Sequence, residues 1–156
     1  MHPNAAVIER FYTAFQRRDG AAMAACYHQD IVFSDPVFPR LEGVHAGNMW
    51  KMLCERGTDL EVTFRDVTAD DRRGSAHWDA RYTFSNTGRK VLNRIDAAFE
   101  LSDGLIIRHT DSFDLHRWAR QALGPLGLVL GWTPIVRNKV RRTAAASLAS
   151  FEKKAA

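Results

Sequence analysis

Hydrophobic residues in the first third of the chain recur at the spacing of amphipathic helices. Apolar positions three and four residues apart predict a first helix that ends before Gly20, a second over 19–27 and a third over 45–56. The segment 31–37 lies between the second and third helices, and Pro36 excludes a helix interior there. The pattern therefore predicts three helices and one extended segment.

After Gly57 the hydrophobic period changes to two, which is typical of strands. The predicted strands cover 60–64, 76–84, 91–101 and 105–115. Ser102-Asp103-Gly104, between the last two, is a strong hairpin signal. Helices followed by hairpin-linked strands predict an α+β fold with an antiparallel sheet, one face of which the helices must cover.

The end of the chain returns to a helical pattern. Residues 116–123 predict a short helix, glycines and a proline break the pattern at 124–127, and 134–151 predict a long helix with an apolar stripe. We therefore expect a main domain over 1–123 and a C-terminal helical extension over 124–156. The apolar stripe has to pack on a pocket mouth, on the back of the sheet or on a second subunit.

Composition and charge exclude several classes of function. The chain has 156 residues, 46% of them hydrophobic, and a net charge of +4. Its basic residues gather in the last helix without a nucleic-acid-binding motif, so we interpret them as a solvated face. The most apolar stretch, 125–132, is too short to span a bilayer, and the N-terminus has no signal-peptide pattern. We expect a soluble, cytoplasmic protein that binds neither nucleic acid nor membrane.

Metal and nucleotide motifs do not occur in the sequence. The histidines have no HExxH or other zinc-binding spacing, and neither a P-loop nor a GxGxxG string is present. We therefore expect no metal and no cofactor. Aspartates and histidines remain as the residues from which a site could be built.

The order of elements and several short strings resemble the nuclear transport factor 2-like superfamily over about residues 4–117. Ser34-Asp35-Pro36-Val37 and Ile95-Asp96 resemble segments of its ketosteroid isomerases. Thr110-Asp111-Ser112 resembles the last strand of its limonene-type epoxide hydrolases and SnoaL-like polyketide cyclases. The resemblance implies a cone, in which N-terminal helices and a curved antiparallel sheet enclose an apolar pocket, and a homodimer formed through the outer sheet face.

The resemblance also implies catalytic aspartates in that pocket. Asp35 would be the base, Asp96 or Asp111 the acid or oxyanion donor, and His109 a proton shuttle or hydrogen-bond orienter for Asp111. A carboxyl group in an apolar cavity has a raised pKa, which suits acid–base catalysis near neutral pH. On pattern alone, His109 and Asp111 could instead face solvent. Asp96 needs a β-bulge near 97–98 to face inward and is otherwise a surface acid.

Aromatic and apolar side chains are the expected pocket wall, together with one amide. The predicted substrate-binding residues are Tyr12, Phe38, Trp50, Leu53, Trp78, Tyr82 and Asn93.

Two positions depart from the relatives. The tyrosine that the isomerases carry on the first helix falls at Phe11 here, with Tyr12 beside it. The Arg-x-Asp pair of the epoxide hydrolases matches His77-Trp78-Asp79 only with a one-residue shift and with His in place of Arg.

The sequence therefore predicts a cofactor-free acid–base enzyme of the isomerase, cyclase or epoxide hydrolase type, acting on a small hydrophobic substrate. A non-catalytic binding protein of the same fold is one alternative. A dimeric interaction protein, using the outer sheet face and the basic tail, is another.

Overall fold

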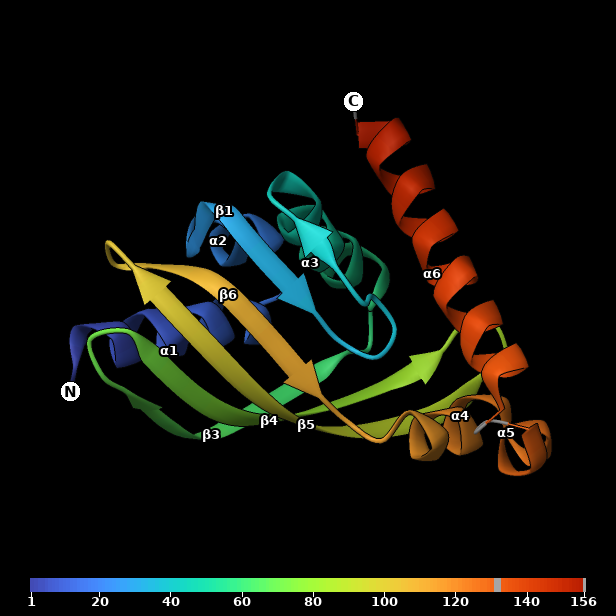
Figure 1. Ribbon diagram of the computed structural model, residues 1–156. Helices are drawn as coiled ribbons and strands as arrows, with labels where there is room; N and C mark the ends of the chain where they lie inside the picture. Colours follow the sequence, from blue (N-terminus) through green and yellow to red (C-terminus); the bar gives the residue numbers. More distant parts are fainter. Residues whose placement is uncertain (131–132, 156) are drawn as a thin grey trace.

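The computed structural model describes residues 1–130 and 133–155 and follows the predicted order of elements (Figure 1). The helices are α1 (Pro3–Gln16), α2 (Gly20–Ala25), α3 (Val44–Arg56), α4 (Leu115–Leu123), α5 (Pro125–Leu130) and α6 (Pro134–Ala155). The strands are β1 (Tyr27–Ser34), β2 (Leu41–Glu42), β3 (Glu61–Ala69), β4 (Arg73–Phe84), β5 (Arg89–Ser102) and β6 (Leu105–Ser112). Gly131 and Trp132, the end of the apolar stretch 125–132, lie outside the described residues.

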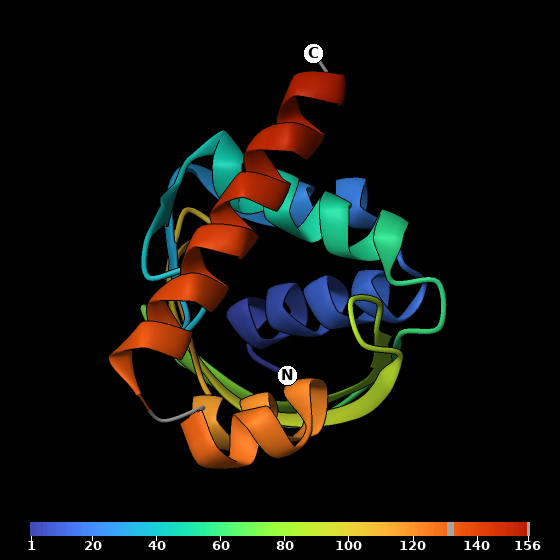
Figure 2. The ribbon, with the colours of Figure 1, turned by 90° about the vertical axis from the view of Figure 1, so that its right-hand side faces the viewer.

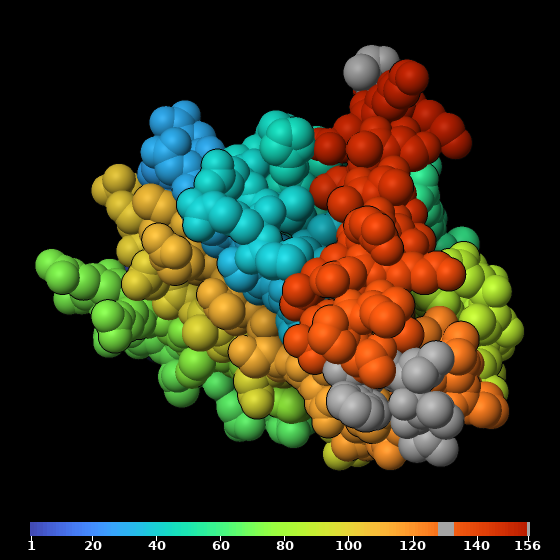
Figure 3. Space-filling view, turned by 45° about the vertical axis from the view of Figure 1, so that its right-hand side comes forward, coloured from blue at the N-terminus to red at the C-terminus, as the bar shows by residue number. Residues whose placement is uncertain are grey.

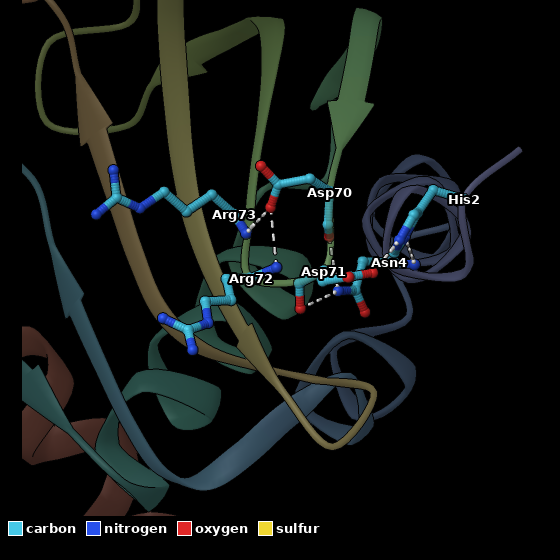
Figure 4. Close-up of polar contacts among 6 residues, drawn as sticks. All are labelled: His2, Asn4, Asp70, Asp71, Arg72 and Arg73. Carbon is cyan, nitrogen blue, oxygen red and sulfur yellow. Dashed lines mark hydrogen bonds and ion pairs between the residues drawn. The ribbon is translucent and has the colours of Figure 1, made fainter.

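Helix α1 is fixed at its start to the turn between β3 and β4. Pro3 occupies the first helical turn, where its missing N–H costs nothing. The side-chain amide of Asn4 donates to the carbonyls of Asp70 and Asp71 at 3.0 and 3.2 Å, and His2 pairs with the Asp71 carboxylate at 2.9 Å (Figure 4). These contacts hold α1 inside the curve of the sheet, as Figure 2 shows.

The six strands form one sheet in the order β2-β1-β6-β5-β4-β3. Four of the five neighbouring pairs are antiparallel, as predicted, but β1 and β6 run parallel. Hydrophobic period and turn residues specify pairing between strands that a short turn connects, and β1 and β6 are far apart in sequence. Since parallel strands end at the same edge, the segment after β1 lies beside the end of β6.

Side-chain alternation along β5 is unbroken at the position where a bulge was expected. Ala97 pairs with Asp111 and Ala98 with Thr110 in regular register, and the irregularity falls later, between Glu100 and Leu101. Residues 95, 97 and 99 therefore face the core, and Asp96 faces the other side of the sheet.

Helix α6 crosses the open side of the curved sheet, from α4 and α5 towards α3 (Figures 2 and 3). Its Leu148 is buried, and Phe151 packs against the main core. Glu152 accepts hydrogen bonds from His45 and Asn48 of α3, at 2.6 and 2.7 Å. Of the three packing surfaces that the apolar stripe allowed, α6 uses the mouth of the cavity described next.

Candidate functional site

A cavity of about 520 Å³ lies between the concave face of the sheet, α3 and α6. This volume is in the range of small-molecule sites. Six of the seven predicted wall residues line it: Phe38, Trp50, Leu53, Trp78, Tyr82 and Asn93. Its acidic lining residues are Asp35 and Asp111, both of which the sequence had placed there. The remaining wall is largely apolar, so the two carboxyl groups face a water-poor space.

Asp111 reaches the cavity from β6 at the end of a buried chain of hydrogen bonds. Trp50 Nε1 donates to the Tyr27 hydroxyl at 2.7 Å, and Tyr27 Oη lies 2.7 Å from His109 Nδ1. His109 Nε2 lies 2.8 Å from Asp111 Oδ1. Trp78 Nε1 donates to the same oxygen at 3.4 Å. Four elements, α3, β1, β4 and β6, thereby fix the orientation of one carboxyl group.

The direction of the donors along this chain follows from chemistry. A carboxylate can only accept, so His109 Nε2 carries the hydrogen that it shares with Asp111. His109 Nδ1 is then available to accept the proton of the Tyr27 hydroxyl. That hydroxyl in turn accepts from the Trp50 indole, which is a donor only. Both ring nitrogens of His109, the Tyr27 hydroxyl and the Trp50 indole N–H thus have partners, as a buried network requires.

His109 itself is fully buried and does not line the cavity. Four aromatic rings surround His109. The centre of its ring lies 4.4 Å from the ring centre of Phe99, 5.0 Å from that of Phe33 and 5.5 Å from that of Phe11. It also stacks on Trp50, with 5.9 Å between ring centres. The predicted role of orienting Asp111 therefore fits its position, whereas direct contact with a ligand does not.

Asp35 is held by the turn that follows β1. Its Oδ1 accepts the backbone N–H groups of Val37 at 2.7 Å and of Phe38 at 2.5 Å, and its own N–H donates to the Phe38 carbonyl at 2.9 Å. This is the local side-chain-to-backbone bonding that aspartates make in turns. The position of Asp35 in this turn is therefore compatible with its predicted place in the pocket.

The pKa of Asp35 is raised from 3.8 to about 7, chiefly by burial and in addition by the nearby charge of Asp111. The backbone N–H groups of Phe38 and Val37 and the cation of Arg141 act in the opposite direction. Near neutral pH, Asp35 is consequently divided between its protonated and ionised forms, which suits a group that gives and takes protons.

The two acids share one geometry. In each, Oδ1 is held by two N–H donors, whereas Oδ2 has no hydrogen-bond partner among the described residues. Each carboxyl group is therefore oriented by one oxygen and leaves the other for a molecule in the cavity.

The raised pKa of Asp35 predicts a pH-dependent stability difference. The unfolded chain releases this proton near pH 4 and the folded chain near pH 7, so the ionised group weakens the fold as the pH rises between these values. Asp35→Asn, which can still accept the two N–H bonds, should therefore match the wild type at about pH 4 and exceed its free energy of unfolding at about pH 8. The gain is at most about 4 kcal/mol and is reduced by any solvent in the cavity. Urea unfolding of both proteins at both pH values checks this. Equal free energies of unfolding for Asp35→Asn and the wild type at pH 8 as well as at pH 4 would contradict it.

Asp96 does not belong to the cavity, so its predicted role as an acid or oxyanion donor is wrong. Its side chain is 84% exposed on the outer face of the sheet, where it lies 2.9 Å from His77 Nδ1. The other ring nitrogen of His77 lies 2.9 Å from Asp79, on the same outer face. Side chains along β5 alternate regularly at this position, and no bulge turns Asp96 inward, so the role implied by the resemblance does not apply. Dimerisation through this outer face stays a prediction.

Tyr12 is also not a wall residue, contrary to the prediction. It is completely buried beneath the cavity, and its ring stacks on Phe64 at 5.4 Å. Its hydroxyl has no hydrogen-bond partner among the described residues. Burial raises the pKa of Tyr12 well above its usual value, and this hydroxyl stays protonated.

Sequence reasoning missed Tyr27 and the contribution of α6. Tyr27 was assigned to the end of the second helix, yet it is the first residue of β1. Six residues of α6 line the cavity: Val136, Lys139, Val140, Thr143, Ala144 and Ser147. The apolar stripe of α6 signalled that it packs on something, but no local signal identified the cavity as the surface it covers.

Residues 1–130 and 133–155 contain neither a cluster of possible metal ligands nor a membrane-spanning helix. No three His, Cys, Asp or Glu side chains of these residues lie where they could hold a metal ion. Their helices include none that is both long and apolar enough to cross a bilayer.

Comparison with known proteins places this geometry in a family. A family model described as the SnoaL-like domain matches residues 8–109. A candidate polyketide cyclase from Xanthomonas campestris pv. campestris is 26% identical, with 76% of this chain and 96% of that chain covered and a TM-score of 0.62. No curated protein matches the chain.

Two further solved structures share the fold at lower identity. An LEH-like epoxide hydrolase from M. tuberculosis is 21% identical, with 82% of this chain and 96% of that chain covered and a TM-score of 0.65. An NTF2-like protein of unknown function from Burkholderia pseudomallei K96243 is 18% identical, with 78% and 98% covered and a TM-score of 0.67. The chain belongs to the SnoaL-like domain family, within the nuclear transport factor 2-like fold.

Proposed function

We propose that this protein is a cofactor-free acid–base enzyme that moves protons next to a carbonyl group of a small, hydrophobic, ring-containing substrate. One observation carries the proposal: Asp35 and Asp111 face the same largely apolar cavity, each with one oxygen held by N–H donors and the other without a partner in the part of the chain that the structure describes. Paired acids in unlike environments provide the two proton-transfer groups that such a reaction needs.

The environments of the two acids suggest a role for each, and these roles reverse those that the resemblance implied, in which Asp35 was the base and Asp111 a candidate for the acid. Asp111 Oδ1 accepts from His109 and Trp78, and Oδ2 of this carboxylate is available to take a proton from the carbon next to the carbonyl. Asp35, whose pKa is about 7, can donate its proton to the carbonyl oxygen as charge develops there. The product of this step is an enol, with one proton moved from carbon to Asp111 and one from Asp35 to oxygen.

Two outcomes then return both acids to their starting states. In an isomerisation of a substrate with a carbon–carbon double bond next to the reacting carbon, the enol is a dienol. Asp111 returns its proton to the far carbon of that double bond, the double bond shifts into conjugation with the carbonyl, and the enol hydroxyl gives its proton back to Asp35. In a ring closure, the enol carbon bonds to a second carbonyl carbon of the same molecule. The enol hydroxyl returns its proton to Asp35, and the new alkoxide takes the proton from Asp111. Neither route consumes an oxidant, a reductant or a metal.

The proposal favours carbonyl chemistry over epoxide hydrolysis for a specific reason. His77 and Asp79, which resembled the second catalytic pair of the epoxide hydrolases, lie on the outer face of the sheet with Asp96. The likeness to a candidate polyketide cyclase at 26% identity supports the same preference.

A proton-exchange assay tests the function without the natural substrate. The protein is incubated in D₂O with a panel of fused-ring ketones such as 2-tetralone, and loss of the hydrogen next to the carbonyl is followed by ¹H NMR. We expect the wild type to accelerate exchange in at least one ketone that it binds, and Asp111→Asn to abolish the acceleration. Ketones that bind without any accelerated exchange would contradict the proposal and favour the binding-protein alternative.

A further inference from the structure

Helix α6 does more than cover the cavity, because one of its side chains reaches the turn that carries Asp35. Arg141 Nε donates to the carbonyl of Pro36 at 2.9 Å. Pro36 is the residue after Asp35, inside the turn whose N–H groups bind the Asp35 carboxyl group. Pro36 and Arg141 are 105 positions apart in sequence, so this bond joins the C-terminal extension to the turn that carries Asp35.

Within the turn, three hydrogen bonds join Asp35 to Val37 and Phe38, and none of them involves Pro36. Proline has no backbone N–H, so the Pro36 carbonyl is the only main-chain hydrogen-bonding group of that residue. Asp35 itself is held through Val37 and Phe38. The Pro36 carbonyl and the Val37 N–H belong to the same planar peptide group. A shift of that carbonyl would therefore move the Val37 N–H away from Asp35 Oδ1.

We propose that Arg141 is a positioning residue for Asp35, which it holds against the cavity by clamping the Pro36 carbonyl. The clamp makes α6 a working part of the acid–base site. Arg141 lies outside residues 8–109, the part of the chain that the family model matches. The catalytic meaning of this role rests on the proposed function, but the clamp can be measured without any substrate.

Electrostatics agrees with the geometry. The positive charge of Arg141 lowers the pKa of Asp35, against the larger upward effects of burial and of Asp111. Other titratable groups line the cavity or the neighbouring crevice close to the Asp35 turn. Arg56, Lys139 and Tyr82 share the cavity wall, Tyr27 lies behind it, and Asp114, His116 and Arg137 line a neighbouring crevice with Pro36 and Arg141. Arg141 bonds the Asp35 turn directly, through the Pro36 carbonyl.

Three variants separate the clamp from general effects of charge. Arg141→Gln removes both the cation and the guanidinium geometry, and Arg141→Lys keeps the charge but cannot reproduce Nε. Arg142→Gln is the matched control, since Arg142 is the next residue on α6 and is exposed. Leu148 and Glu152 still anchor α6 to the main domain in all three.

The readout is a ¹³C NMR titration of the Asp35 carboxyl group, together with hydrogen exchange of the Val37 and Phe38 amides. We expect Arg141→Gln to shift the Asp35 midpoint upward and to speed amide exchange in the turn. Arg141→Lys should speed exchange with a smaller upward shift, and Arg142→Gln should change neither. A midpoint and amide protection in Arg141→Gln equal to those of Arg142→Gln would overturn the proposal, whatever the activity of the variants.

Discussion

Asp35→Asn should lower the rate of proton transfer at the cavity by about 10²- to 10⁴-fold, the usual contribution of a general acid or base. The amide can accept the N–H bonds of Val37 and Phe38, so the turn keeps its shape, but it cannot donate a proton to a carbonyl oxygen as an acid does. The loss should therefore appear in kcat, while ligand affinity changes little. The measurement is ketone proton exchange under saturating and subsaturating ketone.

Asp96→Asn provides the matched control for that result. It makes the same chemical change at an aspartate on the outer face, 84% exposed and outside the cavity. We expect its exchange rate to equal that of the wild type. If Asp35→Asn retained full activity, or if both variants lost it equally, the assignment of Asp35 as the working acid would be wrong.

His109→Ala should destabilise the fold by about 3–5 kcal/mol, because it leaves buried polar groups without partners and opens a void in the core. The change deletes the donor to Asp111 and the acceptor of the Tyr27 hydroxyl, and it leaves a void against Phe99. Urea unfolding followed by tryptophan fluorescence measures the effect.

His77→Ala is the corresponding change on the outer face of the sheet. His77 also sits between carboxyl groups, those of Asp79 and Asp96, but its side chain is 17% exposed and that of Asp96 is 84% exposed, whereas the His109 side chain has no exposed surface. We expect a loss of about 1 kcal/mol, smaller than that of His109→Ala, because ion pairs with access to solvent contribute little. Similar losses for His109→Ala and His77→Ala would show that the buried chain does not stabilise the site as described.

Some parts of this site could be read from the sequence because they depend on local pattern. His109 and Asp111 are two residues apart on a strand, which put them on one face, and the structure places both on the core side. Asp35 lies in a turn sequence before a proline, and the turn is what holds its carboxyl group. For Asp96 the same local reasoning also held, because the simple alternation of β5 was correct and the short resemblance misled.

The parts that could not be read depend on contacts between distant segments. Tyr27 joins the site through the parallel pairing of β1 with β6, which no turn or hydrophobic period specifies. The bond from Arg141 to Pro36 requires that α6 cross the cavity mouth, and the apolar stripe of α6 fits several surfaces equally. Such long-range choices depend on the shape of the whole fold and not on the pattern of any one segment.

The proposed function requires that the Asp35 carboxyl group, inside the largely apolar cavity, exchange its proton near physiological pH. A ¹³C titration of the aspartate side chains in the wild-type protein measures this directly, with Asp35→Asn identifying the signal. Burial in the cavity predicts a midpoint for Asp35 of about 7. A midpoint close to 4, the value of an aspartate in open water, would contradict it.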